Sequence, residues 1–190
     1  MIIRRAVIDD LPTIVELRRE RAAWLADIGS DQWSVGLTER GFRQRVQDSI
    51  QAGETWMATA DDGRVVGTIA IDQWTNPGLW SQAELADAVI VHRMITRRCA
   101  AGQGIGQALL AHTDRFAIDA GRRWVRLDAW TSNHGLHRYY EHAGFRHVRT
   151  VADYPSRSTA LFEREVSMSA AQHGALAQSS RLTLRYRPEA

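Results

Sequence analysis

The fold of this chain is decided by the stretch Ala101-Gly102-Gln103-Gly104-Ile105-Gly106. It lies between a predicted strand, 88–95, and a predicted helix, 104–120. Glycine lets the backbone approach a ligand with its N–H groups turned inward, and a helix N-terminus adds partial positive charge. We therefore expect this turn to hold a phosphate group through its backbone. A glycine hinge without a ligand would give the same short pattern, so further support has to come from other residues.

Two common nucleotide-binding motifs do not fit this turn. A dinucleotide-binding fold requires G-x-G-x-x-G with an acidic residue about 20 positions later. Here the spacing is G-x-G-x-G and the preceding strand lies late in the chain, after a predicted hairpin, although Asp128 is near the place of such an acid. A P-loop requires lysine, but all 24 Lys and Arg residues of this chain are arginine. The same absence excludes a Schiff-base or pyridoxal-phosphate lysine.

Composition favours one globular domain. Of the 190 residues, 44% are hydrophobic and 24% are charged. No apolar run approaches the roughly 20 residues that cross a bilayer, and the charged N-terminus is unlike a secretory signal. The single cysteine, Cys99, excludes an internal disulfide framework and a multi-cysteine metal site. We expect a cytoplasmic protein without a metal or a membrane partner, and a formal charge of +2 gives no argument for nucleic acid.

Periodicity and turn signals predict a mixed α/β domain over 1–166 and a tail, 167–190, that is flexible or adds an edge strand at 182–186. Asp9 or Asp10 is expected to cap the first helix and Thr38 the second. The predicted strands are 2–7, 55–59, 64–72, 88–95, 124–129, 145–151 and 160–166. The predicted helices are 10–25, 38–52, 104–120 and 136–143.

A second segment, Asn133-His134-Gly135-Leu136-His137-Arg138-Tyr139-Tyr140-Glu141-His142-Ala143-Gly144-Phe145, gives the glycine turn a context. Strand, glycine turn, helix, strand and this segment together resemble the GNAT superfamily of N-acetyltransferases. The turn matches the pattern Q/R-x-x-G-x-G/A except at Ala101, and the segment matches N-x-x-A-x-x-Y-Y-E-x-x-G-F except at Leu136. The resemblance spans 2–166 and implies the GNAT fold, a central, mostly antiparallel sheet of six to seven strands, splayed at strand 88–96 and flanked by helices.

The resemblance also implies an acyl-CoA-dependent N-acyltransferase that uses acetyl-CoA. The backbone around Met94, Ile95 and Thr96 is expected to splay at a bulge and to bind the pantetheine arm like an added strand. The N–H groups from Gly102 to Gly106, with Ala101 before them, are expected to hold the pyrophosphate. Because Ala101 replaces the usual Gln or Arg, either Arg97 or Arg98 supplies the missing charge or the affinity for the donor is weaker.

Two residues of the second segment have implied roles. Asn133 is expected to contact the pantetheine or to order the acceptor side. Tyr140 is expected to protonate the departing thiolate, although a core tyrosine at this position is the structural alternative. Direct attack by the amine is favoured over an acyl-cysteine, because Cys99 is the only thiol and is expected to be a packing residue.

The general base is less defined by the sequence. Glu84, Asp87 and His92 lie near the start of the central strand, where the family often places a base or a water-holding carboxylate. We rank Asp87 first, because a desolvated carboxylate gains the basicity to accept a proton. A structural role for each of the three and a water chain as the base stay open.

The acceptor is expected to be a primary amine of a small molecule, bound by Trp33, Asp72 and Trp74. Aromatic rings with a nearby carboxylate suit a cationic amine, although packing explains tryptophans equally well. A protein amine as acceptor, another donor such as a longer acyl-CoA or an aminoacyl-tRNA, and a coenzyme A-binding sensor without activity are the alternatives. An exposed strand edge and the tryptophan-rich loops are compatible with a homodimer.

Overall fold

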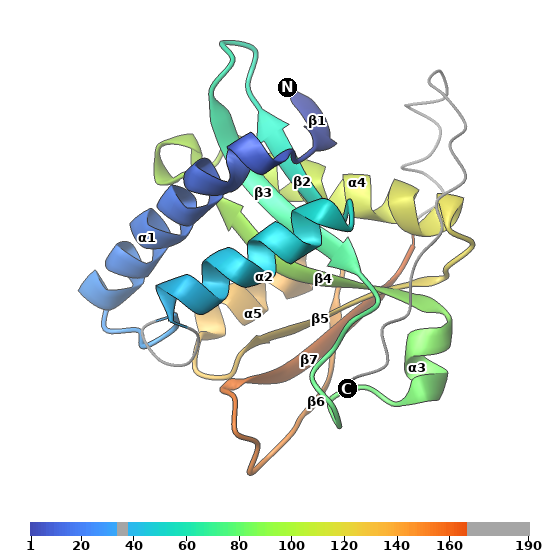
Figure 1. Ribbon diagram of the computed structural model, residues 1–190. Helices are drawn as coiled ribbons and strands as arrows, with labels where there is room; N and C mark the ends of the chain where they lie inside the picture. Colours follow the sequence, from blue (N-terminus) through green and yellow to red (C-terminus); the bar gives the residue numbers. More distant parts are fainter. Residues whose placement is uncertain (34–37, 167–190) are drawn as a thin grey trace. The chain divides into compact units, whose positions relative to one another are not determined.

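The structure, a computed structural model, describes residues 1–33 and 38–166 (Figure 1). Residues 34–37, the tail 167–190 and the candidate strand 182–186 lie outside this part. The seven strands form one sheet in the order β1-β2-β3-β4-β5-β7-β6. The chain divides into two compact units, Met1–Ala70 with Arg93–Leu109, and Ile71–His92 with residues from Leu110 onward. Both β3 (Val65–Asp72) and β4 (Ala88–Thr96) contribute residues to each unit.

The first unit contains an antiparallel arrangement of β1 (Ile2–Arg5), β2 (Thr55–Thr59) and β3. Helices α1 (Leu11–Asp27) and α2 (Glu39–Gln51) lie side by side in it (Figure 1). Their apolar residues recur at helical spacing, so each helix buries one face. The core that they form with β2 consists of Ala6, Leu11, Ile14, Val15, Phe42, Val46, Ile50 and Met57.

The caps of the two helices were predicted with different success. Thr38 caps α2, since its Oγ1 accepts a hydrogen bond from the N–H of Gly41 at 3.2 Å. Asp10 is the N-cap residue of α1, after the short 3-10 turn η1 (Ile8–Asp10), but its carboxylate does not cap the helix. Instead it accepts two hydrogen bonds from Arg4, at 2.7 and 2.8 Å, and one from the N–H of Val7 at 2.8 Å. The guanidinium is a stronger partner than a helix amide, because both groups are charged.

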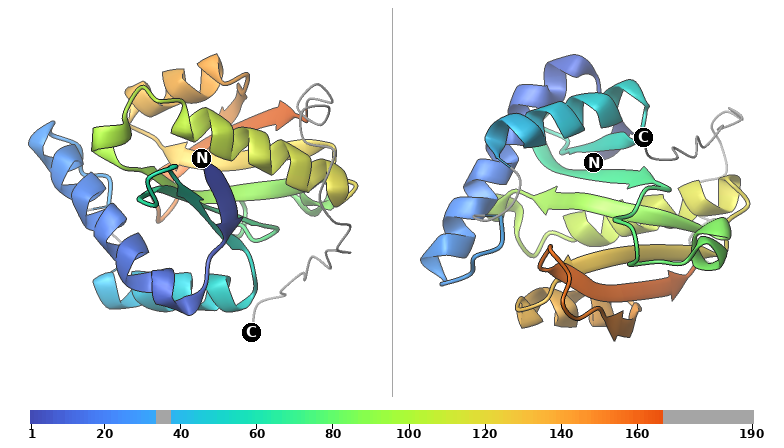
Figure 2. Two further views of the ribbon diagram at one scale, coloured as in Figure 1. Left: turned by 90° about the horizontal axis from the view of Figure 1, so that it is seen from above. Right: turned by 60° about the horizontal axis from the view of Figure 1, so that its bottom comes forward.

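In the second unit, β5 (Trp124–Trp130) pairs in parallel with β4 and antiparallel with β7 (Ser158–Glu165), which pairs antiparallel with β6 (Arg146–Thr150). Figure 2 shows β5, β7 and β6 side by side in this order. Helix α5 (His134–His142) follows β5, and α4 (Ile105–Asp119) precedes it. One core cluster of this unit consists of Leu79, Trp80, Ile90 and Leu161.

The short helix α3 (Gln82–Ala86) was missed in the sequence. Ser81 and Glu84 form a capping box, in which Ser81 Oγ accepts from the N–H of Glu84 and the Glu84 carboxylate accepts from the N–H of Ser81 at 2.7 Å. The spacing S-x-x-E is the sequence signal for this motif. Its presence places Glu84 in a helix rather than at the start of β4.

The predicted fold class is confirmed. The sheet is mostly antiparallel, has seven strands and is flanked by helices. Among residues 1–33 and 38–166, no helix combines the length and the apolar character needed to span a membrane.

Candidate active site

The glycine turn has the geometry of an anion cradle. Gly102 and Gly104 have φ angles of +77° and +74°, which L-residues other than glycine rarely adopt. A Cβ atom on Gly102 would meet nothing within 4 Å, and one on Gly104 would meet only Gln107 Oε1 at 3.8 Å. The surface above both glycines is therefore open to a ligand.

Helix α4 begins directly after this turn. Its first intrahelical hydrogen bond runs from the N–H of Ala108 to the carbonyl of Gly104, at 3.0 Å. The N–H groups of Ile105, Gly106 and Gln107 precede that bond, so they are the unpaired first-turn amides of a helix. Together with the positive end of the helix dipole, they fit a pyrophosphate without requiring a lysine.

Arg93, immediately before Met94, has an unusual backbone conformation, and we place the predicted bulge of β4 at this residue. Arg93 has a φ angle of +49°, an uncommon value for a residue with a side chain. The parallel register of β4 with β5 runs from Ala88 to Val91 and ends there. The side chain of Arg93 donates a hydrogen bond to Ser49 Oγ at 3.0 Å, which helps to hold this conformation.

The main chain after the bulge alternates in direction. The N–H of Arg97 donates to the carbonyl of Val66 in β3 at 2.8 Å, so the main-chain groups of Arg97 and Ile95 face β3. In agreement, a Cβ atom on Gly67 of β3 would lie 3.1 Å from the carbonyl oxygen of Ile95. Of the predicted pantetheine-binding residues, only Met94 and Thr96 direct their main chains away from β3.

A residue that the sequence did not single out fixes the end of this segment. Arg21 of α1 donates from Nη2 to the carbonyl oxygen of Thr96 at 2.5 Å and to Thr96 Oγ1 at 3.1 Å. The only sequence signal is the group of arginines at positions 18, 19 and 21, which is as typical of a solvated helix face. Arg21 therefore connects α1 to the predicted pantetheine-binding strand.

Three of the predicted site residues form one cluster in the second unit. The Nε2 atom of His92 lies 2.8 Å from the carbonyl oxygen of Trp74 and 3.1 Å from Asp72 Oδ1. The Asp72 carboxylate also accepts from the N–H of Trp74 at 2.8 Å. The side chains of His92 and Asp72 are 10% and 8% exposed. The indole ring of Trp74 lies 5.7 Å from the imidazole.

This arrangement assigns the proton on the neutral imidazole. A carbonyl oxygen can only accept a hydrogen bond, so Nε2 of His92 carries the hydrogen. The lone pair of the neutral ring is then on Nδ1, which is the atom that can accept a proton. Trp33, the third residue predicted to bind the acceptor, lies in the first unit, with a φ angle of +70° and its carbonyl 3.4 Å from Arg18 Nη2.

The two carboxylates near the start of β4 have local structural partners. Glu84 accepts hydrogen bonds from Arg149 at 2.7 and 3.0 Å, and these, together with Ser81, lower the pKa of Glu84 to about 2. Asp87 is exposed at the end of α3, where its Oδ1 accepts from the N–H of Arg123 at 3.1 Å. A carboxylate held in its ionised form by a guanidinium is a poor base, so the geometry disfavours Glu84. Our ranking of Asp87 over His92 receives no support from the geometry either.

Tyr140 is the buried member of the tyrosine pair in α5, only 6% exposed. Its ring packs against Phe145 at 5.5 Å and Phe162 at 6.0 Å between ring centroids. Burial raises the pKa of Tyr140 above its usual value, and the charge of Asp128 acts in the same direction. The hydroxyl therefore stays protonated at neutral pH, as a proton donor must, although it is a weaker acid than an exposed tyrosine.

Asn133 has a defined structural role. It is the N-cap of α5, and its Oδ1 accepts from the N–H of Leu136 at 3.0 Å. The cap fixes the start of the helix that carries Tyr140. Contact with the pantetheine and ordering of the acceptor side both stay predictions for Asn133.

Comparisons with known proteins agree with these features. Residues 20–145 match the model of the acetyltransferase (GNAT) family. The uncharacterized N-acetyltransferase YesJ of Bacillus subtilis (strain 168) is 27% identical over 164 residues, which are 85% of this chain and 88% of that protein.

Solved structures share the fold. A GNAT-family acetyltransferase from Listeria monocytogenes 4b F2365 has a TM-score of 0.67 at 22% identity, covering 86% of this chain and 94% of its own. The PaiA N-acetyltransferase from Thermoplasma acidophilum, solved with coenzyme A, has a TM-score of 0.66 at 19% identity. The match covers 86% of this chain and 98% of that protein. This chain belongs to the GNAT family of acetyltransferases and is an acyl-CoA N-acyltransferase.

Proposed function

We propose that this enzyme transfers an acetyl group from acetyl-CoA to a primary amine of a small molecule by direct attack. The observation that carries the proposal is the cluster of His92, Asp72 and Trp74. It combines an imidazole whose Nε2 faces a carbonyl oxygen, a carboxylate that can stabilise the protonated ring, and an aromatic wall.

The donor side is supported by the glycine turn and the β4 segment after the bulge. The unpaired first-turn amides of α4 suit the two phosphates of the coenzyme, and the outward main chains of Met94 and Thr96 suit an extended pantetheine arm. Acetyl-CoA would supply the acetyl group as an activated thioester. His92 immediately precedes Arg93 and Met94 in β4, so one strand carries both the proposed base and the proposed pantetheine contacts.

In the proposed reaction, the amine nitrogen forms a bond to the thioester carbonyl carbon while the carbon–sulfur bond breaks. His92 Nδ1 accepts the proton that the amine loses, and Asp72 stabilises the resulting imidazolium. Tyr140 donates its phenolic proton to the departing thiolate and regains one from solvent. A neutral amine and a protonated tyrosine are both required, and the buried Tyr140 meets the second requirement over a wide pH range.

The proposed acceptor is a small amine rather than a protein side chain. Trp74 is half-buried next to the nine-tenths buried His92, which favours a compact substrate with an apolar part close to its amine. The ring face of Trp74 would attract the ammonium form of such a substrate before it is deprotonated.

A panel of primary amines tests this proposal, with release of free coenzyme A thiol as the readout. The panel contains polyamines, amino acids, aminoglycosides and a lysine-containing peptide, each with acetyl-CoA and with a longer acyl-CoA as donor. Turnover of at least one small amine with acetyl-CoA, lost in His92→Gln, is the expected result. Turnover of the peptide alone would overturn the small-molecule acceptor, and thermal stabilisation by acetyl-CoA without turnover of any amine would favour a coenzyme sensor.

A further inference from the structure

The ring of Trp24 in α1 is in contact with the guanidiniums of two arginines. The guanidinium carbon of Arg98 lies 4.5 Å from the ring centroid of Trp24, and that of Arg21 lies 5.1 Å from it. We call Trp24, Arg21 and Arg98 the Trp24 cluster. Trp24 and Arg21 belong to α1, whereas Arg98 belongs to the 3-10 turn η2 (Arg98–Ala100) that leads into the glycine turn. All three lie in the first unit with the glycine turn itself.

The two guanidiniums differ in how they are used. Arg21 is held by the carbonyl and hydroxyl oxygens of Thr96. Burial lowers the pKa of Arg21, and the positive charge of Arg98 lowers it further. The cluster therefore concentrates positive charge, and an anion close to Arg98 would relieve this repulsion.

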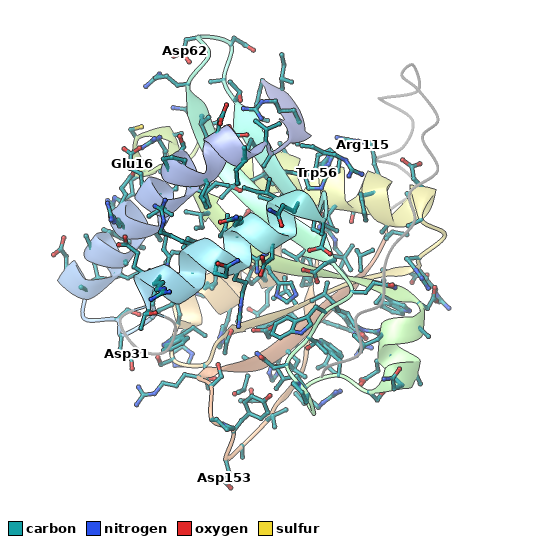
Figure 3. All side chains as sticks on the ribbon, viewed as in Figure 1. Glu16, Asp31, Trp56, Asp62, Arg115 and Asp153 are labelled. Carbon is teal, nitrogen blue, oxygen red and sulfur yellow. The ribbon has the colours of Figure 1, made fainter. Side chains whose placement is uncertain are left out.

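Arg97, the other arginine that precedes the glycine turn, is already engaged. Its Nε donates to the carbonyl of Val65 at 2.9 Å, and its two terminal nitrogens donate to Glu20 at 3.2 Å and to Glu16 at 3.3 Å. Figure 3 labels Glu16 on α1. The hydrogen bond with Glu16 raises the pKa of Arg97, as expected for a cation paired with acids. A ligand phosphate would have to compete with two carboxylates for this side chain.

Arg98 is placed differently. Its backbone N–H donates to Glu20 Oε1 at 2.8 Å, which fixes the main chain, while its side chain is exposed. Within residues 1–33 and 38–166, the guanidinium of Arg98 is paired with no carboxylate, and its partner is the face of Trp24. A cation–π contact with an aromatic ring uses none of the hydrogen-bond donors of a guanidinium, so its N–H groups remain able to donate to an anion.

We propose that Arg98, oriented by Trp24, binds a phosphate of the coenzyme and takes the place of the cation that the family usually has at the position of Ala101. This inference rests on the proposed binding of acetyl-CoA. Arg98 lies three residues before Ala101 and four before Gly102, on the chain that enters the cradle. The pyrophosphate and the 3′-phosphate of coenzyme A share the chemistry that Arg98 would recognise.

Titration calorimetry of the full chain with coenzyme A and with dephospho-coenzyme A tests the proposal. Arg98→Ala is expected to weaken coenzyme A binding by about 10- to 100-fold, the effect of losing a hydrogen bond between charged groups. If Arg98 binds the 3′-phosphate, Arg98→Ala and wild type will bind dephospho-coenzyme A equally. If it binds the pyrophosphate, the variant will bind both ligands more weakly by the same factor.

Arg123→Ala is the matched control. Arg123 is also an exposed arginine over a tryptophan, 5.4 Å from the ring of Trp124, but it pairs with Glu165 in the second unit. The control loses the same charge, so it reports the general effect of charge on binding. Coenzyme A affinity within twofold of wild type is expected for Arg123→Ala, and the same result for Arg98→Ala would overturn the proposal.

Two further variants separate binding from folding. Arg98→Lys keeps the charge but not the planar guanidinium, so its affinity for coenzyme A is expected to lie between those of Arg98→Ala and wild type. Trp24→Leu keeps Arg98 but removes its aromatic support, so a smaller loss than in Arg98→Ala is expected. In Arg98→Ala and in Arg98→Lys, kcat at saturating acetyl-CoA should equal that of wild type, while KM for acetyl-CoA should rise. A fall in kcat with KM unchanged would contradict a phosphate contact. Wild type that does not bind coenzyme A at millimolar concentration would refute the proposed donor, and this proposal with it.

Discussion

The Nε2 atom of His92 lies 3.1 Å from Oδ1 of Asp72, although the two residues belong to different strands, β4 and β3. Both side chains are about nine-tenths buried, where an ionised carboxylate is weakly screened. In the proposed reaction this carboxylate would stabilise the protonated form of the ring. A histidine in this position can accept a proton during catalysis and release it afterwards.

Substitution at this pair should separate the base from the residue that orients it. His92→Gln is expected to reduce kcat by about 100-fold or more, the usual contribution of a general base. Asp72→Asn should cause a smaller loss of kcat, because the imidazolium loses its stabilising charge. Steady-state kinetics between pH 5 and 9 measures both effects, with roughly unchanged affinity for coenzyme A as the control.

Tyr140→Phe should lower kcat and leave coenzyme binding intact. The substitution removes the hydroxyl but keeps the ring that packs against Phe145 and Phe162, so folding is expected to be preserved. Because burial raises the pKa of Tyr140, wild type should show no loss of activity from ionisation of this tyrosine below about pH 10. Parallel loss of thermal stability and of activity in Tyr140→Phe would instead identify Tyr140 as a core residue.

Two glycine substitutions should act in opposite directions on stability. A Cβ atom on Gly67 would lie 3.1 Å from the carbonyl oxygen of Ile95 and 3.2 Å from side-chain atoms of Ile105 and Leu109. Gly67→Ala should therefore lower the free energy of unfolding by about 1–3 kcal/mol through overpacking. A Cβ atom on Gly135 in α5 would lie 3.5 Å from Asn133 Oδ1, which is an ordinary contact. Gly135→Ala should therefore stabilise the helix by about 0.5–1 kcal/mol. Urea denaturation measures both, and a stabilising Gly67→Ala would show that β3 has room to move.

The ion pair of Glu84 and Arg149 should make stability depend on pH in the acidic range. Arg149 lowers the pKa of Glu84 in the folded protein to about 2 from its usual 4.5. The folded state therefore gains stability above about pH 4.5 and loses it as the pH falls from there towards 2. Since Glu84 is partly exposed, solvent screens the pair, and Glu84→Gln should cost about 1 kcal/mol at pH 7. Urea denaturation of wild type and Glu84→Gln measures this effect, and the two free energies of unfolding should differ less at pH 3 than at pH 7.

Much of the fold could be predicted because its signals are local. Thr38 and Gly53 mark the ends of α2, and the spacing of Phe42, Val46 and Ile50 marks its buried face. The glycine turn also follows from local sequence, and Arg93, just before the segment in which we expect a bulge, has a positive φ angle. Helix α3 was missed because a five-residue helix has too few apolar positions to show periodicity.

The candidate site was harder to predict because its contacts join residues distant in sequence. Asp72 and His92 meet only because β3 and β4 place them together, and no local pattern encodes that contact. Glu84 was a candidate base from its position alone, whereas its partner Arg149 is 65 residues away. Neither the cytoplasmic location nor the homodimer is tested by these contacts, and both stay predictions.

The cationic side chains that precede the glycine turn are arginines, and this affects whether the enzyme can be acylated by its own acyl donor. A lysine near a thioester becomes acylated once its amine is deprotonated, and its charge is then lost. Arginine stays protonated over the whole working range of pH and is a poor nucleophile. Arg97 and Arg98 precede this turn in the chain and the sequence has no lysine, so no side-chain amine of the enzyme can compete with the acceptor for the acyl group. The donor site should therefore resist self-acylation even at alkaline pH, where more of the substrate amine is neutral.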